Sequence, residues 1–193
     1  MRGGLDDALL CASLLGALLS IAVLAQSIAF PRIRVWPVPA DSARFHAVRI
    51  FINRAIAPVI GLSAASMLAL SLIDFGSLGL PGWIHIPVGV GLFAAGGRFG
   101  WTGFRTLGPE ISTGTPGDLQ VRGPYRISRN PQYVGAVGVL TGLALCSNSL
   151  MVLLAAVSWS FWFWLAPLAE EPWLRAHLGD PYISYASKTK RYL

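Results

Sequence analysis

Residues 121–135 read VRGPYRISRNPQYVG, a polar hinge directly before the longest uncharged part of the chain. The hinge holds three arginines, two tyrosines, two prolines and two glycines. Residues 131–169 form an uncharged run of 39 residues, which ends at the acidic pair Glu170 and Glu171. Two membrane crossings need roughly 40 residues, so this run predicts a helical hairpin. A basic, aromatic hinge and an acidic pair at the two ends of the hairpin indicate a site at the membrane surface.

The composition of the chain is that of an integral membrane protein. Of its 193 residues, 54% are hydrophobic and 12% are charged, whereas soluble domains carry roughly 25% charged residues. The net charge of +6 does not predict a nucleic-acid partner, because the basic residues lie beside apolar spans and suit anionic lipid headgroups. Cys11 and Cys146 have neither zinc-ligand nor redox spacing, so they are interpreted as packing residues and no metal site is expected.

The uncharged runs predict an all-α fold, a polytopic membrane helical bundle of about five transmembrane helices. Roughly 20 helical residues cross the hydrocarbon. The predicted spans are residues 8–30, 55–73 and 83–97, the last extended by 77–82, and then the two arms of the hairpin, which turns near 147–149. Ser27-Ile28-Ala29 resembles a signal-peptide cleavage site, but the long apolar run and the acids Asp6 and Asp7 favour a retained helix.

The distribution of lysine and arginine predicts the orientation of these spans. Five basic residues lie in 31–54, five in 98–130 and four in 170–193, and Arg2 alone lies on the other side, which accounts for all 15. Basic residues accumulate on the cytoplasmic side of membrane proteins. The pattern therefore predicts an N-terminus outside, a C-terminus in the cytoplasm, and the hinge and acidic pair together on the cytoplasmic face.

The hinge and the acidic pair each allow a structural and a functional interpretation. The hinge arginines can meet lipid phosphates while its tyrosines form an aromatic belt, or the arginines can bind a carboxylate or phosphate ligand. Glu170 and Glu171 stand at the expected end of a span, where a helix C-terminus disfavours negative charge. Pairing with Arg126 or Arg129 is expected for them, and such acids can also bind ribose hydroxyls, an ammonium or a sulfonium group.

Four short motifs carry a resemblance to a known superfamily. GPYRISRNPQYVG at 123–135 resembles the GPYxxxRHPxYxG signature of the isoprenylcysteine carboxyl methyltransferase and phospholipid methyltransferase superfamily of integral membrane enzymes. EEPWL at 170–174 and LGDPYISY at 178–185, followed by Arg191, are similar to its EExxL…FGxxYxxY…R tail. RTLG at 105–108 is similar to a short leucine-glycine element of the same superfamily.

The resemblance implies an S-adenosylmethionine-dependent membrane methyltransferase with a cytoplasm-facing cofactor pocket. It covers about residues 96–193, which would form the methyltransferase core, while residues 1–95 would form the N-terminal spans. It implies Arg129 and Glu171 as catalytic residues. The implied cofactor-binding residues are Gly100, Gly103, Tyr125, Arg126, Asn130, Pro131, Tyr133, Gly135, Glu170 and Glu171.

Two departures from the superfamily pattern leave the methyl acceptor open. Asn130 replaces the histidine of the carboxyl methyltransferases, although phospholipid methyltransferases also carry asparagine there, and Leu178 replaces a phenylalanine. A carboxylate acceptor would need a positive partner such as Arg129 or Arg126. An amine acceptor would need a proton acceptor, for which Glu171 is the candidate. Isoprenylcysteine, a phospholipid amine and small thiols all remain compatible with the sequence.

The expected partners are the bilayer and a lipid or lipid-modified substrate, with no nucleic acid, and the oligomeric state stays open. The expected location is the cell inner membrane, with the active site facing the cytoplasm. Two other functions also remain open at this stage. Membrane sterol reductases, which use NADPH, resemble the superfamily in their C-terminal region, although this chain is short for them. A non-catalytic membrane scaffold could also keep the fold.

Overall fold

The computed structural model describes residues 2–37, 42–114 and 117–193, and within them the chain is helical without a β-strand. The elements of the N-terminal part are α1 (Arg2–Ala29), η1 (Pro31–Ile33), α2 (Ser42–Phe51), η2 (Ile52–Ile56), α3 (Ala57–Ile73) and α4 (Gly82–Leu107). Those of the C-terminal part are α5 (Pro109–Ser112), η3 (Gly123–Arg126), α6 (Pro131–Ser147), α7 (Leu150–Leu178) and α8 (Asp180–Lys188). The predicted all-α fold is confirmed. The predicted loops 31–54 and 98–130 each include residues outside the described ranges.

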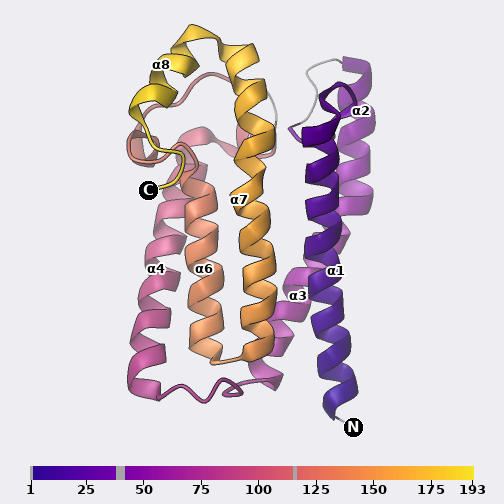
Figure 1. Cartoon of the computed structure of the whole chain (residues 1–193), viewed down its shortest axis with the longest axis vertical. Helices are drawn as coiled ribbons and strands as arrows, with labels where there is room; N and C mark the ends of the chain where they lie inside the picture. The colour runs from indigo at the N-terminus through magenta and orange to yellow at the C-terminus, as the bar shows by residue number, and fades with distance from the viewer. Residues whose placement is uncertain (1, 38–41, 115–116) are drawn as a thin grey trace.

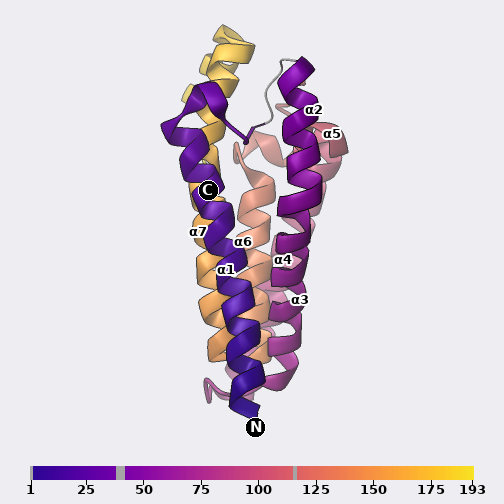
Figure 2. The same cartoon turned by 90° about the vertical axis from the view of Figure 1, so that its right-hand side faces the viewer.

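The long helices run side by side along one axis (Figures 1 and 2). In Figure 1, α4, α6 and α7 form one group, α1 and α3 form another, and α1 packs on α7 to join them. The N-terminus lies at one end with the α3–α4 and α6–α7 connections, whereas α8, α2 and the segment directly after α1 lie at the other. The three basic segments of the sequence therefore meet at one end of the bundle.

Glycines bring α4 and α6 into backbone contact. A Cβ added to Gly135 would lie 2.4 Å from the amide nitrogen of Gly100, and one added to Gly96 would lie 2.7 Å from the carbonyl oxygen of Gly135. A Cβ added to Gly142 would lie 2.5 Å from the amide nitrogen of Phe93. Small residues allow helices in membranes to approach this closely. The contact fixes the start of α6, and with it the hinge, against the last turns of α4.

Three described helices are long and apolar enough to cross a membrane, and they lie at residues 4–29, 46–73 and 150–178. The chain is therefore consistent with an integral membrane protein. α6 is apolar but has 17 residues, about 25 Å at 1.5 Å per residue, and α4 is interrupted by polar residues. The number of five crossings and their orientation stay predictions.

The bounds of two predicted spans were wrong. The second helix does not begin at residue 55, because a helical path runs from Ser42 through the π-helical turn η2 into α3. In that turn the amide of Ala57 donates to the carbonyl of Ile52, and Pro58, which has no N–H group to donate, follows directly. The third helix extends from Gly82 to Leu107 and excludes 77–81. The sequence analysis ended this span at Gly97 because Arg98 follows, but a helix can carry charge beyond its apolar part.

The predicted turn of the hairpin is confirmed at Asn148, which has φ 50° and separates α6 from α7. Ser149 caps α7 by accepting a hydrogen bond from the amide of Val152 at 3.1 Å. Asp74 joins this turn to the α3–α4 connection, because its Oδ2 accepts from the Ser149 hydroxyl at 2.5 Å and from the Ser77 hydroxyl at 2.7 Å. These hydrogen bonds to Asp74 fix the end of the bundle opposite the basic segments.

Candidate functional site

A pocket opens at the end of the bundle where the basic segments meet. The space between its protein atoms is about 860 Å³, a volume that includes the open mouth. Five parts of the chain contribute to its wall: the segment after α1, the end of α4 with α5, the 117–120 segment, the hinge with the start of α6, and the end of α7 with α8. Its polar and aromatic lining residues are Trp36, Ser112, Asp118, Gln120, Tyr125, Arg129, Asn130, Gln132, Tyr133, Glu170, Trp173, Tyr182 and Tyr185.

The hinge turns sharply because of its glycine and proline. Gly123 has φ +54°, and Pro124 starts the short helix η3. Tyr125, at the centre of η3, is buried, and its hydroxyl oxygen accepts a hydrogen bond from Nε2 of Gln132 at 3.0 Å. Burial raises the pKa of Tyr125 to about 12, so its hydroxyl is neutral near pH 7. Arg126 is exposed and does not line the pocket.

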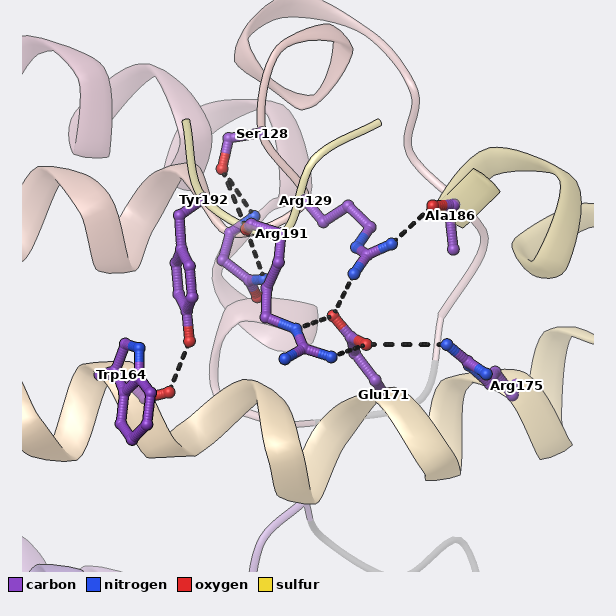
Figure 3. A network of polar contacts seen from close by, with 9 residues as sticks. Ser128, Arg129, Trp164, Glu171, Arg175, Ala186, Arg191 and Tyr192 are labelled. Carbon is purple, nitrogen blue, oxygen red and sulfur yellow. Dashed lines mark hydrogen bonds and ion pairs between the residues drawn. The ribbon is translucent and has the colours of Figure 1, made fainter. Parts of the chain in front are cut away.

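Glu171 is the centre of an ion-pair network (Figure 3). Its side chain is 5% exposed, and its Oε1 accepts from Nη2 of Arg129 and from Nε of Arg191, both at 2.8 Å. Nη2 of Arg191 donates to Oε2 at 2.8 Å, and Arg175 stands 3.9 Å away. The expected pairing with Arg129 is confirmed, whereas Arg126 takes no part. Both oxygens of Glu171 are thus engaged with guanidinium groups, and Glu171 does not line the pocket.

The end of the chain, residues 189–193, is tied to the hinge. The amide of Arg129 donates to the carbonyl of Lys190 at 2.9 Å, and Nδ2 of Asn130 donates to the carbonyl of Arg191 at 3.0 Å. The hydroxyl of Tyr192 donates to the carbonyl of Trp164 at 2.5 Å on α7. The side-chain amide of Asn130 therefore holds residues 189–193 against the hinge.

Glu170 has a different environment from its neighbour. Its Oε1 accepts from the indole Nε1 of Trp36 at 2.5 Å and from the hydroxyl of Tyr133. It lines the pocket, and no ion pair with a basic group is formed by it within the described residues. Consecutive residues of a helix project about 100° apart, so one acid points to the pocket and the other to the arginines.

The acidic pair was expected at a helix end, but it does not stand there. α7 continues through the pair to Leu178, about two turns beyond. The expectation rested on the end of the uncharged run at residue 169. The charge of Glu171 within α7 is instead met by Arg129 of the hinge and by Arg191.

The structure brings together some of the predicted site residues at the pocket and places others elsewhere. Tyr125, Arg129, Asn130, Tyr133 and Glu170 line the pocket, whereas Gly100, Gly103, Arg126, Pro131, Gly135 and Glu171 are absent from its described lining. Gly100, Gly103 and Gly135 belong to the α4–α6 contact, where a Cβ on Gly103 would stand 3.1 Å from Cγ of Pro131. The cofactor-binding and catalytic roles of all these residues remain predictions.

Several pocket residues were missed from the sequence. Trp36 is 134 positions from Glu170, and nothing in the sequence connects the two. Trp173 and Asp118 had no motif of their own. Tyr182 and Tyr185 did have a signal, because they stand in the LGDPYISY motif, and burial raises the pKa of Tyr185 to about 12. The hydroxyl of Tyr185 donates to the carbonyl of Tyr125 at 2.7 Å and so joins α8 to the hinge.

The wall of the pocket carries groups of both signs of charge. Nη1 of Arg129 donates to the carbonyl of Ala186 at 2.7 Å and Nη2 donates to Glu171, but its Nε is buried without a hydrogen-bond partner. An orphaned, charged N–H group of this kind costs stability unless an acceptor meets it, so it can serve an anionic group. Glu170 and the aromatic rings of Trp36, Tyr133 and Trp173 suit a cationic group.

A metal centre is not indicated. The described residues contain no group of three or more histidine, cysteine, aspartate or glutamate side chains that could hold a metal ion.

An apolar groove lies beside the pocket. It runs between α6 and α7 and is lined by Tyr133, Val134, Val137, Ser160, Phe163, Trp164, Tyr192 and Leu193. Tyr133 belongs to both linings, and its ring stands 5.6 Å from the ring of Phe163. One side chain is thus shared by the pocket and by a groove suited to hydrocarbon.

Comparison with known proteins places this site in a family. A family model described as phospholipid methyltransferase matches residues 84–181, which include α4, the hinge, the hairpin and the acidic pair. No curated protein and no solved structure matches the chain. The matched region begins within α4, as does the predicted core at residue 96, so the division of the chain at 95/96 cuts a continuous helix.

Proposed function

We propose that this chain, which belongs to the phospholipid methyltransferase family, transfers a methyl group from S-adenosylmethionine to a lipid or lipid-modified acceptor. Membership of the family supports membrane methyltransferase activity, in agreement with the resemblance stated from its motifs. The observation that carries the finer proposal is the shared pocket, in which Arg129 of the hinge and Glu170 of α7 face one space.

The described residues fit the methyl donor. S-adenosylmethionine has a carboxylate, an ammonium, a sulfonium and an adenosine, and it supplies an activated methyl group when bound. The orphaned Nε of Arg129 suits the carboxylate. Glu170 suits the ammonium, the sulfonium or a ribose hydroxyl, and the rings of Trp36 and Trp173 suit the cation or the adenine.

The acceptor would approach along the apolar groove. The groove offers α6 and α7 side chains to a hydrocarbon chain, and Tyr133 joins it to the pocket. A polar headgroup would then stand beside the methyl donor, where alignment and exclusion of water lower the barrier. This arrangement favours a lipid-tailed acceptor over a small thiol.

The residue that accepts a proton from an amine acceptor is proposed to be Glu170. Glu171, the candidate from the sequence, has both oxygens engaged by guanidinium groups, and such a carboxylate is a weak base. Glu170 accepts hydrogen bonds from neutral donors instead. For a carboxylate acceptor no proton need be removed, and Arg129 would provide the positive partner.

The protein is proposed to lie in the cell inner membrane, with the site facing the cytoplasm. The support is the charge pattern, since the basic segments gather at the end of the bundle that holds the pocket. The same segments would attract anionic lipid headgroups.

Calorimetry on the purified full-length protein tests the donor proposal. S-adenosylmethionine should bind to the wild type, and Glu170→Ala should weaken binding at least tenfold, as expected for loss of a contact to a charged group (about 1.5–3 kcal/mol). Lys188→Ala, which changes an exposed residue of α8 outside the pocket lining, should bind as the wild type does. Absence of binding in both detergent and lipid would refute the proposal.

The acceptor is identified by a methyl-transfer assay. Membranes that contain the protein are incubated with radiolabelled S-adenosylmethionine, and the lipids are then separated. Label in a lipid, lost in Glu170→Ala, supports the proposal. The same preparation with NADPH in a thermal-shift experiment tests the reductase alternative, which would predict stabilisation by NADPH alone. A folded protein that binds neither molecule would favour the scaffold alternative.

A further inference from the structure

The segment that follows α1, residues 30–37, is fixed to α1 by side chains. Ser27, which is 4% exposed, accepts hydrogen bonds at its Oγ from the amides of Val35 at 3.0 Å and Trp36 at 3.1 Å. Nε2 of Gln26 donates to the carbonyl of Ile33 at 3.0 Å. Because one hydroxyl accepts from two consecutive amides, the backbone at Trp36 has a fixed position relative to α1.

The indole of Trp36 is held on several sides. Its Nε1 donates to Oε1 of Glu170 at 2.5 Å, and it packs beside the buried residues Leu24 and Ala166. Gly114 has φ +87°, and a Cβ added there would stand 2.8 Å from the indole ring. The ring therefore packs against the backbone after α5 at a place that only glycine allows.

The same segment reaches a second pocket residue of α7. The guanidinium of Arg34 lies 5.7 Å from the ring centroid of Trp173, within the range of a cation–π interaction. Nε of Arg34 also donates to the carbonyl of Pro37 at 3.1 Å. The segment thus contacts α7 at Glu170 and at Trp173, which both line the pocket.

The contact to Glu170 determines how its carboxylate is oriented. Trp36 and Tyr133 both donate to Oε1, and Oε2 has no hydrogen-bond partner among the described residues. Two neutral donors on one oxygen restrict rotation of the group and leave its charge uncompensated. The second oxygen is then free to meet a ligand.

We propose that Trp36 is a positioning residue of the methyl-donor site, whose indole N–H group holds Glu170 so that the second carboxylate oxygen serves the ligand. The inference rests on the proposed function, because it takes the pocket to hold S-adenosylmethionine. Trp36 lies outside residues 84–181, which the family model matches. The N-terminal part of the chain therefore contributes to the site in addition to anchoring the protein.

The test compares two conservative variants of the full-length protein by calorimetry with S-adenosylmethionine. Trp36→Phe keeps an aromatic ring and removes the N–H group, and its Kd should rise about tenfold, as for a lost hydrogen bond to a charged group. Trp159→Phe is the matched control. It removes an indole hydrogen bond of 2.9 Å to Ser63, which lies away from the pocket, and its Kd should stay within twofold of the wild type.

Thermal unfolding of the ligand-free proteins provides the second measurement. If Trp36 acts through Glu170, the loss of Tm caused by Trp36→Phe should largely disappear in a Glu170→Ala background. Any of three results would overturn the inference. The Kd of Trp36→Phe could be unchanged, the Kd of Trp159→Phe could rise as much, or the losses of Tm caused by Trp36→Phe and Glu170→Ala could be additive. Failure of the wild type to bind would refute the proposed function itself, whereas binding that ignores Trp36 would refute only this inference.

Discussion

The ion-pair network around Glu171 allows a sharp prediction about stability. The side chains of Glu171 and Arg129 are 5% and 11% exposed, and their charged atoms stand 2.8 Å apart. Glu171→Gln keeps the shape of the side chain but leaves Arg129 buried beside a neutral amide. Breaking a buried pair by removing one partner costs about 3–5 kcal/mol, because the remaining charge is left uncompensated.

The expected shift in melting temperature follows from that free energy. For a chain of 150–250 residues, 1 kcal/mol corresponds to about 2–4 °C, so Glu171→Gln should lower Tm by roughly 10 °C. Arg191 is 37% exposed, and a pair with one exposed partner is worth about 1 kcal/mol or less. Arg191→Ala should therefore lower Tm by about 2–4 °C, and it should add almost nothing in the Glu171→Gln background.

The assay is thermal unfolding of the purified protein in detergent, followed by its intrinsic tryptophan fluorescence. Hydrogen exchange with mass spectrometry provides a local readout, because residues 189–193 are tied to the hinge through Arg191 and their amides should exchange faster in Glu171→Gln. Glu110→Gln is the control, since Glu110 is exposed on α5. A Tm within 2 °C of the wild type together with an equally protected chain end would refute the reasoning.

Three further predictions concern the rest of the bundle. Gly135→Ala should lower Tm by several degrees, because its Cβ would stand 2.4 Å from the backbone of Gly100 and overpacking costs about 1–3 kcal/mol. Gly61→Ala is the control: a Cβ added at Gly61 would have no atom within 4 Å, so Tm should stay unchanged or rise slightly. Ser63→Ala should cost about 1–3 kcal/mol in thermal unfolding, because it leaves a buried tryptophan N–H group without an acceptor. Burial raises the pKa of Asp74, but its hydrogen bonds outweigh burial and hold that pKa below the usual 3.8; its contribution is then complete above pH about 4 and lost as the pH falls below it. Asp74→Asn should reduce this acid-side loss of stability in a Tm-against-pH series, and an unchanged slope would contradict the assignment.

The sequence by itself determined the fold class and the neighbourhood of the site. Long uncharged runs predict helices whatever their partners are, and the hairpin turn at Asn148 follows from the length of the 131–169 run. The motifs identified the family, and the opposite charges of the hinge and the acidic pair predicted pairing with Arg126 or Arg129, of which the structure shows Arg129 with Glu171. These features depend on local composition, on spacing and on charge, which a sequence displays directly.

The tertiary structure alone decided which acid faces the pocket. Glu170 and Glu171 are adjacent in sequence, but the rotation of about 100° per residue in α7 turns one to the pocket and the other to the arginines. The bounds of α4 were also decided by packing, because its last turns lie against the glycines of α6. Contact between Trp36 and Glu170 depends on how α1 packs on α7, across 134 positions of the chain. The hinge thus remained the organising segment, but its partners were fixed by side-chain directions and long-range packing, which residue spacing does not encode.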